Sequence, residues 1–131
     1  MILPLNILIV EDCRVMQTII TRTLHILNSG AKSIDLACNG REGLRMMENK
    51  DYDLLILDIN MPVMDGMEMI HQMQKKPRLA GIPVLVVTTE SNTSRIETIK
   101  RLGTGFVHKP FTPELFKSEI LKITAEISQS T

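Results

Sequence analysis

An apolar run that ends in a carboxylate lies near the middle of the chain, in the segment Leu54-Leu55-Ile56-Leu57-Asp58-Ile59-Asn60-Met61-Pro62-Val63-Met64-Asp65-Gly66. A continuous apolar run of this length is typical of a strand that is covered on both faces. Asp58 follows the run directly, in a loop that contains proline and glycine. Because burying an unpaired charge costs several kcal/mol, we expect Asp58 either at the solvent-exposed lip of a sheet or in a functional site there.

The bulk composition is that of an ordinary globular protein. The chain has 131 residues, 44% of them hydrophobic and 23% charged, and its formal net charge is zero. We expect one domain over residues 1–131, with a core at about 6–127 and a frayed tail at 128–131. The charge balance gives no reason to expect a nucleic-acid or anionic-membrane partner. No apolar run approaches the ~20 residues of a membrane span.

The two cysteines, Cys13 and Cys38, have neither metal-ligand spacing nor the number that a disulfide framework needs. The N-terminal residues lack a charged region and a cleavage site, so they do not read as a signal peptide. Both observations favour the cytoplasm as the compartment.

Strand and helix patterns alternate five times along the chain. Continuous apolar strands are expected at 7–10, 54–57 and 84–87, and edge strands at 33–37 and 105–108. Between and after them, the 3.6-residue period and capping signals predict five helices, near 16–27, 39–47, 65–73, 94–102 and 113–127. The helix-start signals are Asn39, Asp65 and Thr112, the last with Phe111 and Phe116 at the positions of a hydrophobic staple. This alternation predicts an α/β fold, a doubly wound parallel sheet of five strands with right-handed crossovers. Three central and two edge strands suit the order 2-1-3-4-5.

Ligands of such sheets bind outside the carboxyl ends of the strands. The strand ends of this chain carry Glu11 and Asp12, Asp58, Thr88, and Lys109. Each pair of carboxylates at ~4 Å would repel by about 1 kcal/mol in water and about 4 at an effective dielectric of 20. A raised pKa or a bound cation relieves this, and an open oxygen-rich site suits Mg²⁺. Singly, each residue could be a helix cap, a β-former or a loop; jointly they predict phosphoryl transfer onto Asp58.

These motifs resemble those of the receiver domains of two-component response regulators, of the chemotaxis-regulator type. The resemblance covers the chain from about residue 6 to 127, and its most specific parts are the loop from Asp58 to Gly66 and Lys109-Pro110-Phe111. It implies a flavodoxin-like fold with the strand order 2-1-3-4-5, so the predicted strand order rests on the family resemblance as well as on the strand pattern.

By resemblance, Asp58 is the phosphoacceptor and Mg²⁺ is the cofactor. Asp12, Asp58 and the backbone carbonyl of Asn60 would hold the ion, with Glu11 acting through water. Thr88 and Lys109 would contact the phosphoryl group, and the Lys109–Pro110 bond would be cis.

The resemblance also implies a switch and its partners. Thr88 and Phe106 would relay phosphorylation to a partner surface at 94–102, 105–108 and 112–128, and Asn60 and Glu90 would tune the lifetime of the phosphoryl group. The donor would be a histidine kinase or a phosphotransfer protein, and the target a downstream effector. The domain would catalyse only its own phosphorylation and dephosphorylation, as a monomer or a phosphorylation-dependent dimer.

Three positions depart from the commonest family pattern. Glu11 stands where the family usually has Asp, Thr89 where it has a small residue, and Phe106 where it often has Tyr. Glu reaches further, so metal binding is expected to be retained. Thr89 would narrow access to Asp58, and Phe106 offers no hydroxyl to a partner.

Two other functions stay open from the sequence. One is an aspartate-nucleophile, Mg²⁺-dependent phosphatase of the haloacid-dehalogenase kind, although Asn60 stands where those enzymes carry a second Asp as general acid. The other is a phosphorelay intermediate or sink without direct output. The chain could also be the receiver part of a longer regulator.

Overall fold

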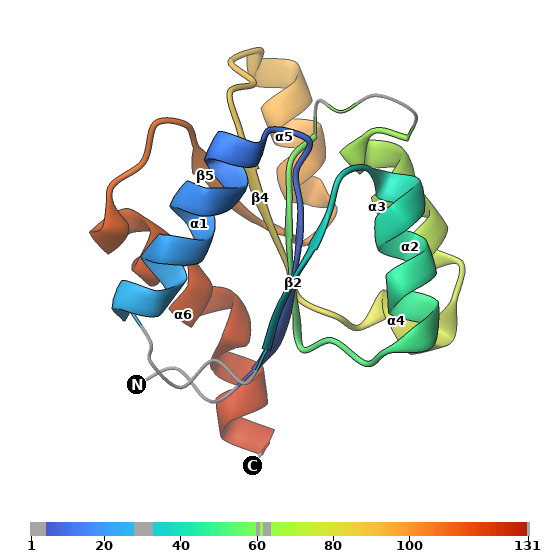
Figure 1. Cartoon of the computed structure of the whole chain (residues 1–131). Helices are drawn as coiled ribbons and strands as arrows, with labels where there is room; N and C mark the ends of the chain where they lie inside the picture. Colours follow the sequence, from blue (N-terminus) through green and yellow to red (C-terminus); the bar gives the residue numbers. More distant parts are fainter. Residues whose placement is uncertain (1–4, 28–32, 60, 62–63, 131) are drawn as a thin grey trace.

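The computed structural model describes residues 5–27, 33–59, 61 and 64–130, with the side chains of all of these except Leu27 and residues 125–130. Five parallel strands form one sheet in the order β2-β1-β3-β4-β5, which confirms the predicted order (Figure 1). The strands are β1 (Asn6–Val10), β2 (Ser33–Ala37), β3 (Leu54–Leu57), β4 (Val84–Thr88) and β5 (Gly105–His108). As expected, β2 and β5 are the edge strands.

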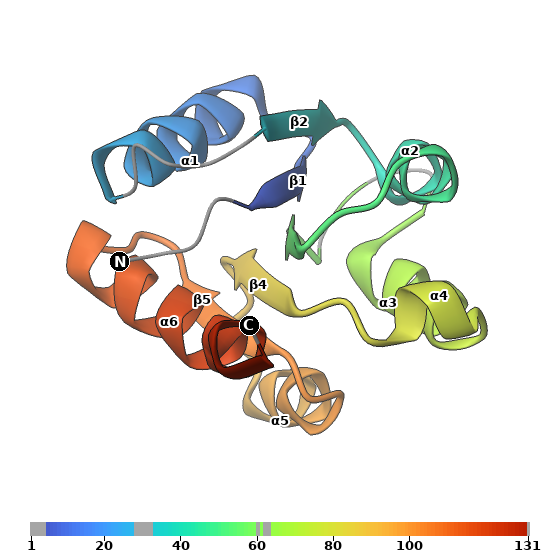
Figure 2. The same ribbon diagram turned by 90° about the horizontal axis from the view of Figure 1, so that it is seen from below.

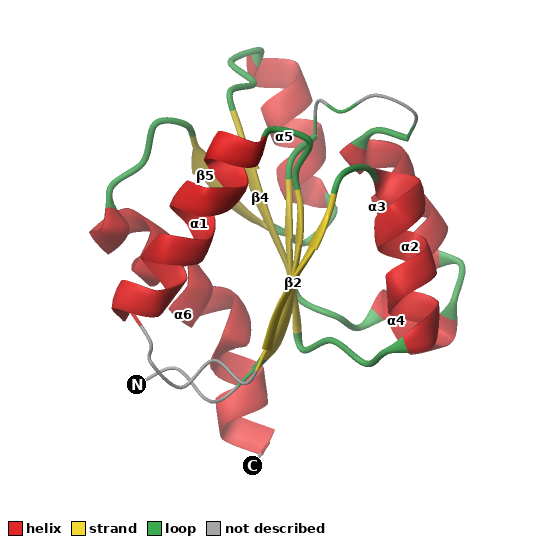
Figure 3. Ribbon diagram, in the orientation of Figure 1, coloured by secondary structure: helices red, strands yellow, loops and turns green. Residues whose placement is uncertain are grey.

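The described residues form six helices, one more than the five predicted (Figure 3). They are α1 (Arg14–Leu27), α2 (Gly40–Asn49), α3 (Gly66–Gln74), α4 (Pro77–Ala80), α5 (Thr93–Arg101) and α6 (Pro113–Ser130). The helix that the sequence did not predict is α4. It spans a single turn opened by Pro77 at its first position, with no side-chain cap. Such a turn is too short to display the 3.6-residue period.

The helices cover both faces of the sheet, as Figure 2 shows from below. Helices α1 and α6 pack on one face, and α2, α3, α4 and α5 on the other. Each strand contributes to both cores, because successive side chains point to opposite faces. In β1, Leu8 and Val10 pack in the core beneath α2, α3, α4 and α5, while Ile7 and Ile9 pack in the core beneath α1 and α6. This two-sided burial explains why the central strands are continuous apolar runs rather than alternating ones.

The predicted helix signals form the expected contacts. The side chains of Asn39 and Asp65 accept hydrogen bonds from backbone N–H groups at the starts of α2 and α3. Thr112 accepts from the N–H of Leu115 at 3.2 Å. The rings of Phe111 and Phe116 stack with centroids 5.0 Å apart, as a hydrophobic staple requires.

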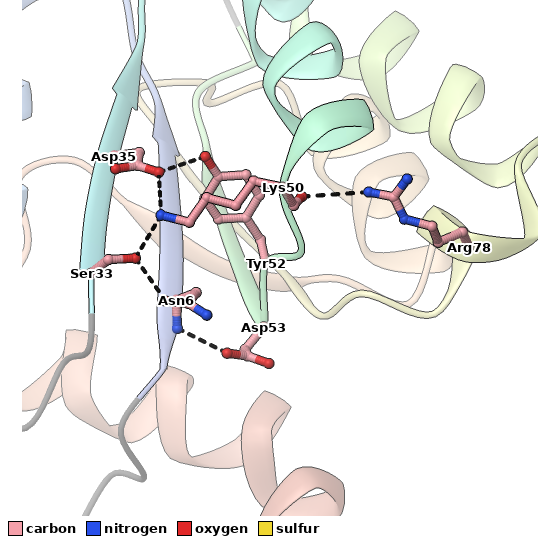
Figure 4. A network of polar contacts seen from close by, with 7 residues as sticks. All are labelled: Asn6, Ser33, Asp35, Lys50, Tyr52, Asp53 and Arg78. Atoms are coloured by element: carbon pink, nitrogen blue, oxygen red, sulfur yellow. Dashed lines mark hydrogen bonds and ion pairs between the residues drawn. The ribbon is translucent and has the colours of Figure 1, made fainter.

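A polar network connects the strands near their amino ends (Figure 4). Asp35 on β2 accepts hydrogen bonds from the Tyr52 hydroxyl at 2.6 Å and from the Lys50 ammonium at 2.9 Å. Lys50 also donates to the Ser33 hydroxyl, which in turn donates to the Asn6 side chain. The network therefore fastens the edge strand β2 to β1 and to the chain that enters β3.

None of the helices in the described part of the chain combines the length and the hydropathy that a membrane crossing needs.

The Tyr52 hydroxyl gives the first testable prediction. We expect Tyr52→Phe to lower the free energy of unfolding at neutral pH by about 1 kcal/mol, because the ring keeps its packing and only the hydrogen bond to Asp35 is lost. The hydrogen bonds from Tyr52 and then Lys50 hold the pKa of Asp35 below its ordinary 3.8. Folding therefore favours the ionised form, so this stabilisation is present above pH 3.8 and is lost as the pH falls further.

Urea unfolding of the wild type and the variant, followed above and below pH 3.8 by circular dichroism, measures this. The difference between the two proteins should shrink in acid. A difference that stays constant with pH would contradict the assigned role of Asp35.

Candidate functional site

The carboxyl edge of the sheet brings together the acidic residues that the strand ends predict. The ladder continues one residue beyond the strands: the N–H of Asp58 donates to the carbonyl of Val10, and that of Glu11 to the carbonyl of Ala37, both at 3.0 Å. Glu11 and Asp58 thus leave neighbouring strands at the same level. These backbone hydrogen bonds fix the main-chain positions from which the two carboxylate side chains extend.

Three carboxylates form a cluster at this edge. Glu11, Asp12 and Asp58 each place one oxygen within 4.8 Å of the others. Glu11 is 1% exposed and Asp58 is 8% exposed, while Asp12 is open to solvent. The cluster is therefore anchored in the protein and accessible from one side.

Lys109 brings a positive charge into the cluster from the end of β5. Its Nζ lies 2.5 Å from Glu11 Oε1 and 3.7 Å from Asp58 Oδ2, and its side chain is 11% exposed. The Lys109 backbone N–H also donates to the carbonyl of Thr88 at 2.8 Å. The lysine thus lies within reach of Asp58, and its shortest contact is with Glu11.

Glu11 carries the most perturbed carboxyl group of the site. Burial raises the pKa of Glu11 from 4.5 to about 7; the hydrogen bond from Lys109 opposes this rise and the charge of Asp58 adds to it. Glu11 Oε2 is buried and has no hydrogen-bond partner among the described residues. A buried oxygen without a donor, beside two further carboxylates, fits a hard divalent cation that prefers oxygen ligands.

The neighbouring strand end supplies a buried hydroxyl. Thr88 is completely buried, and its Oγ1 accepts from the N–H of Glu90 at 3.3 Å. The Glu90 carboxylate accepts from the N–H of Asn92 and pairs with Arg95 at 3.4 Å. Glu90 is therefore engaged at the start of α5. Thr89, which was expected to narrow access to Asp58, is exposed.

Phe106 on β5 is half-buried and pairs in register with Val86 on β4. Its ring packs against the core beneath α5, and the Lys100 ammonium lies 5.5 Å from the ring centroid. No pattern in the sequence predicts this cation–π contact. Asn60 lies outside the described residues, so its predicted roles are not addressed by the structure. The Lys109–Pro110 bond is cis, as the resemblance implied.

Two supporting residues were not among the predicted site residues. The Gln17 side chain donates to the Glu11 carbonyl at 2.6 Å and is buried. Gly66 lies so close to the strand end that a Cβ there would be 2.5 Å from the Asp58 carbonyl oxygen. Gln17 could have been found from the sequence because it is a polar residue on the apolar, buried side of the first helix. Gly66 could have been found because it ends the loop that follows Asp58.

A strand-end aspartate held among carboxylates, with a lysine and a buried threonine on adjoining strand ends, is the arrangement of phosphoaccepting signalling switches, and the fold is theirs too. The chain belongs to the response regulator receiver domain family, which it matches over residues 7–121.

Relatives of known sequence and structure agree with this. The chain is 34% identical over 125 residues to the chemotaxis protein CheY of Pseudomonas aeruginosa. The matched region covers 95% of this chain and 99% of that protein. It is similar to the crystallised chemotaxis protein CheY4 of Vibrio cholerae, with a TM-score of 0.79, 29% identity and coverage of 90% and 97%. It is also similar to the receiver domain of a signal transduction histidine kinase from Syntrophus aciditrophicus, with a TM-score of 0.81, 28% identity and coverage of 93% and 91%.

The family membership confirms a CheY-like domain of two-component signalling. The comparisons give no support to the phosphatase alternative. Because the relatives include both separate chemotaxis proteins and a domain of a sensor kinase, they leave the downstream pathway open.

The Glu11 carboxyl predicts how metal binding depends on pH. A divalent cation needs the ionised carboxylate, whereas the raised pKa of about 7 favours the protonated form below neutrality. We therefore expect Mg²⁺ to bind about tenfold more weakly at pH 6 than at pH 8, with release of a proton at the lower pH. Without metal, the contribution of Glu11 to the free energy of unfolding should fall as the pH rises from 4.5 to 7.

Isothermal titration calorimetry in buffers of different ionisation enthalpy measures both the affinity and the proton release. Glu11→Gln is the control, since it cannot titrate and should lose the pH dependence. Equal affinity at the two pH values in the wild type, with no proton released, would show that Glu11 is not part of the metal site.

Proposed function

We propose that Asp58 is the phosphoacceptor of this receiver domain, with Mg²⁺ as the cofactor. The observation that carries the proposal is the position of the Asp58 carboxylate at the end of a buried strand. One of its oxygens lies within 4.8 Å of oxygens of Glu11 and Asp12, and Oδ2 lies 3.7 Å from the Lys109 ammonium. An ionised carboxylate is already a nucleophile, so no general base is needed.

The reaction follows from these groups. An Asp58 oxygen forms a bond to phosphorus while the bond from phosphorus to the donor nitrogen, or to the oxygen of a small acyl phosphate, breaks and its electron pair leaves with the donor. Lys109 stabilises charge on the transferred oxygens, and Thr88 donates its hydroxyl proton in a hydrogen bond to one of them. Bound Mg²⁺ neutralises negative charge on the phosphoryl oxygens. Glu11, Asp12 and Asp58 would hold it, together with the carbonyl of Asn60.

The donor would be a histidine kinase or a phosphotransfer protein. Large apolar side chains are exposed on α1 just after the acidic pair: Val15 is 69% exposed and Ile19 is 42% exposed. An apolar face next to a phosphoacceptor suits a helix of the donor, which must bring its phosphorylated side chain to Asp58. We propose this face as the donor contact.

The output would pass through Thr88 and Phe106. Phosphorylation adds about −1.5 to −2 charges. Thr88 would turn toward the new oxygens, and Phe106, which pairs with Val86 two residues before Thr88, would move into the space released beneath α5. The surface formed by α5, β5 and α6 would then present a different shape to an effector.

Further roles belong to the same proposal. Asn60 and Glu90 would tune the lifetime of the phosphoryl group on Asp58. The rate of dephosphorylation in the variants Asn60→Ala and Glu90→Ala measures this role. The domain would turn over no substrate other than its own phosphoryl group. It would act in the cytoplasm, as a monomer or a phosphorylation-dependent dimer, either on an effector directly or as an intermediate or sink in a phosphorelay.

Acetyl phosphate tests the phosphoacceptor. We expect the wild type with Mg²⁺ to gain the mass of one phosphoryl group, and Asp58→Asn to gain none, because an amide is not a nucleophile at neutral pH. Asp12→Asn and chelation of Mg²⁺ should slow the reaction without moving the modified site. Intact-protein mass spectrometry, with peptide mapping of the product, measures all of these. A phosphoryl group on another residue, or undiminished labelling of Asp58→Asn, would refute the assignment.

Beryllofluoride tests the switch, since it mimics the phosphoryl group on an aspartate. We expect chemical-shift changes at Phe106, Thr88 and Lys100 on titration with beryllofluoride and Mg²⁺, because the ring must leave the Lys100 ammonium when it turns. Asp58→Asn should show none of them. If the shifts stay confined to the residues around Asp58, Phe106 is not the reporter.

A further inference from the structure

A groove runs along α1, between this helix and β2, and extends away from the end of α1 that lies next to the acidic cluster. Its volume is about 390 Å³, and its lining consists of five residues of α1 and one of β2: Arg14, Gln17, Thr18, Thr21, Arg22 and Leu36. None of these described lining residues carries a carboxylate. It is not used by the phosphoryl chemistry described above.

Leu36 of β2 lines the groove, and within the described part of the chain no strand pairs with the outer edge of β2. β2 is the outermost strand, and its hydrogen bonds to β1 begin at the Ser33 N–H and end at the Ala37 carbonyl. Because alternate residues of an edge strand point their backbone groups inward, Ile34 and Leu36 direct their N–H and carbonyl groups outward. The Leu36 side chain is 43% exposed beside them. An edge of this kind can pair with a further strand.

The wall of the groove carries unpaired positive charge. Arg14 and Arg22 are exposed, and neither forms an ion pair among the residues that the structure describes. They lie eight positions apart on α1, about 12 Å along the helix axis. Residues i and i+4 of an extended chain share one face and lie about 13 Å apart. Two acidic side chains at that spacing match the two arginines.

A hydroxyl in the same wall lacks a partner. Thr21 Oγ1 is buried and forms no hydrogen bond with the described residues. A buried donor without an acceptor costs about 1–3 kcal/mol. Rotation of its side chain toward the groove would let it donate to a backbone carbonyl or to an acidic side chain there.

We propose that this groove binds an extended acidic segment of a partner protein, which adds a strand to the edge of β2. The segment carries acidic residues at i and i+4, paired with Arg14 and Arg22, and an apolar residue at i+2 over Leu36. The main-chain bonds give affinity, and the charge spacing gives selectivity. This contact lies on α1 beside the Val15 and Ile19 face proposed for the donor, and it is distinct from the surface of α5, β5 and α6.

The labelled peptide TETVTET carries this pattern on a strand-forming background. We expect its fluorescence anisotropy to rise with the wild type, and its Kd to weaken about tenfold or more with Arg14→Glu/Arg22→Glu, since two attractions become repulsions. Arg22→Glu alone, further from the acidic cluster, should show part of the loss. Arg101→Glu is the matched control, an exposed arginine at the end of α5, and should bind like the wild type. The charge-reversed peptide TKTVTKT should prefer the double variant.

The binding mode is checked by hydrogen exchange followed by NMR. The amides of Ile34 and Leu36 should become protected when TETVTET binds, while that of Asp35, which already faces β1, should change little. Binding without protection of Ile34 and Leu36 would overturn strand addition. Displacement of the peptide by millimolar inorganic phosphate would show a simple anion site instead, and no binding of TETVTET at all would overturn the proposal.

Discussion

The ion pair between Glu11 and Lys109 is the contact on which the proposed phosphorylation site depends. It joins groups 98 positions apart in the chain, from strand ends with β3 and β4 between them, and both side chains are almost fully buried. Removing one partner from a buried pair leaves an uncompensated charge, at a cost of about 3–5 kcal/mol. Asp58 lies beside this pair and shares its cation. The geometry around the phosphoacceptor is therefore set by a balance of charges as much as by packing.

That balance explains why the site is built on a sheet buried on both faces. Two hydrophobic cores hold the five strands, so their carboxyl ends keep a fixed spacing despite the repulsion among the carboxylates. The same sheet would carry the proposed signal. Thr88 ends β4, and Phe106 pairs with Val86 two residues earlier on that strand, so a movement at Thr88 would reach Phe106 within one pair of neighbouring strands.

The strands and most helix starts could be predicted from the sequence because their signals are local. The apolar runs gave the central strands, and Asn39, Asp65 and Thr112 marked helices that begin where they should. Helix α4 escaped because one turn carries no period. Helix α5 begins at Thr93, one residue earlier than predicted, because the Asn92 side chain caps it.

The site was predictable to the level of which residues meet, and no further. Strand order brings Glu11, Asp58 and Lys109 to one edge, but which carboxylate Lys109 approaches most closely depends on side-chain reach and burial. Likewise, the contact of Lys100 with Phe106 and that of Glu90 with Arg95 arise from exposed helix side chains that no pattern fixes. The loop glycine has a consequence of another kind. A methyl group at Gly66 would meet the main chain of Asp58 and Ile59, which cannot swing aside as a side chain can. In a library that randomises this loop, Gly66 should be the position where even alanine is rejected, and neutral drift around the phosphoacceptor is blocked there by backbone volume rather than by chemistry.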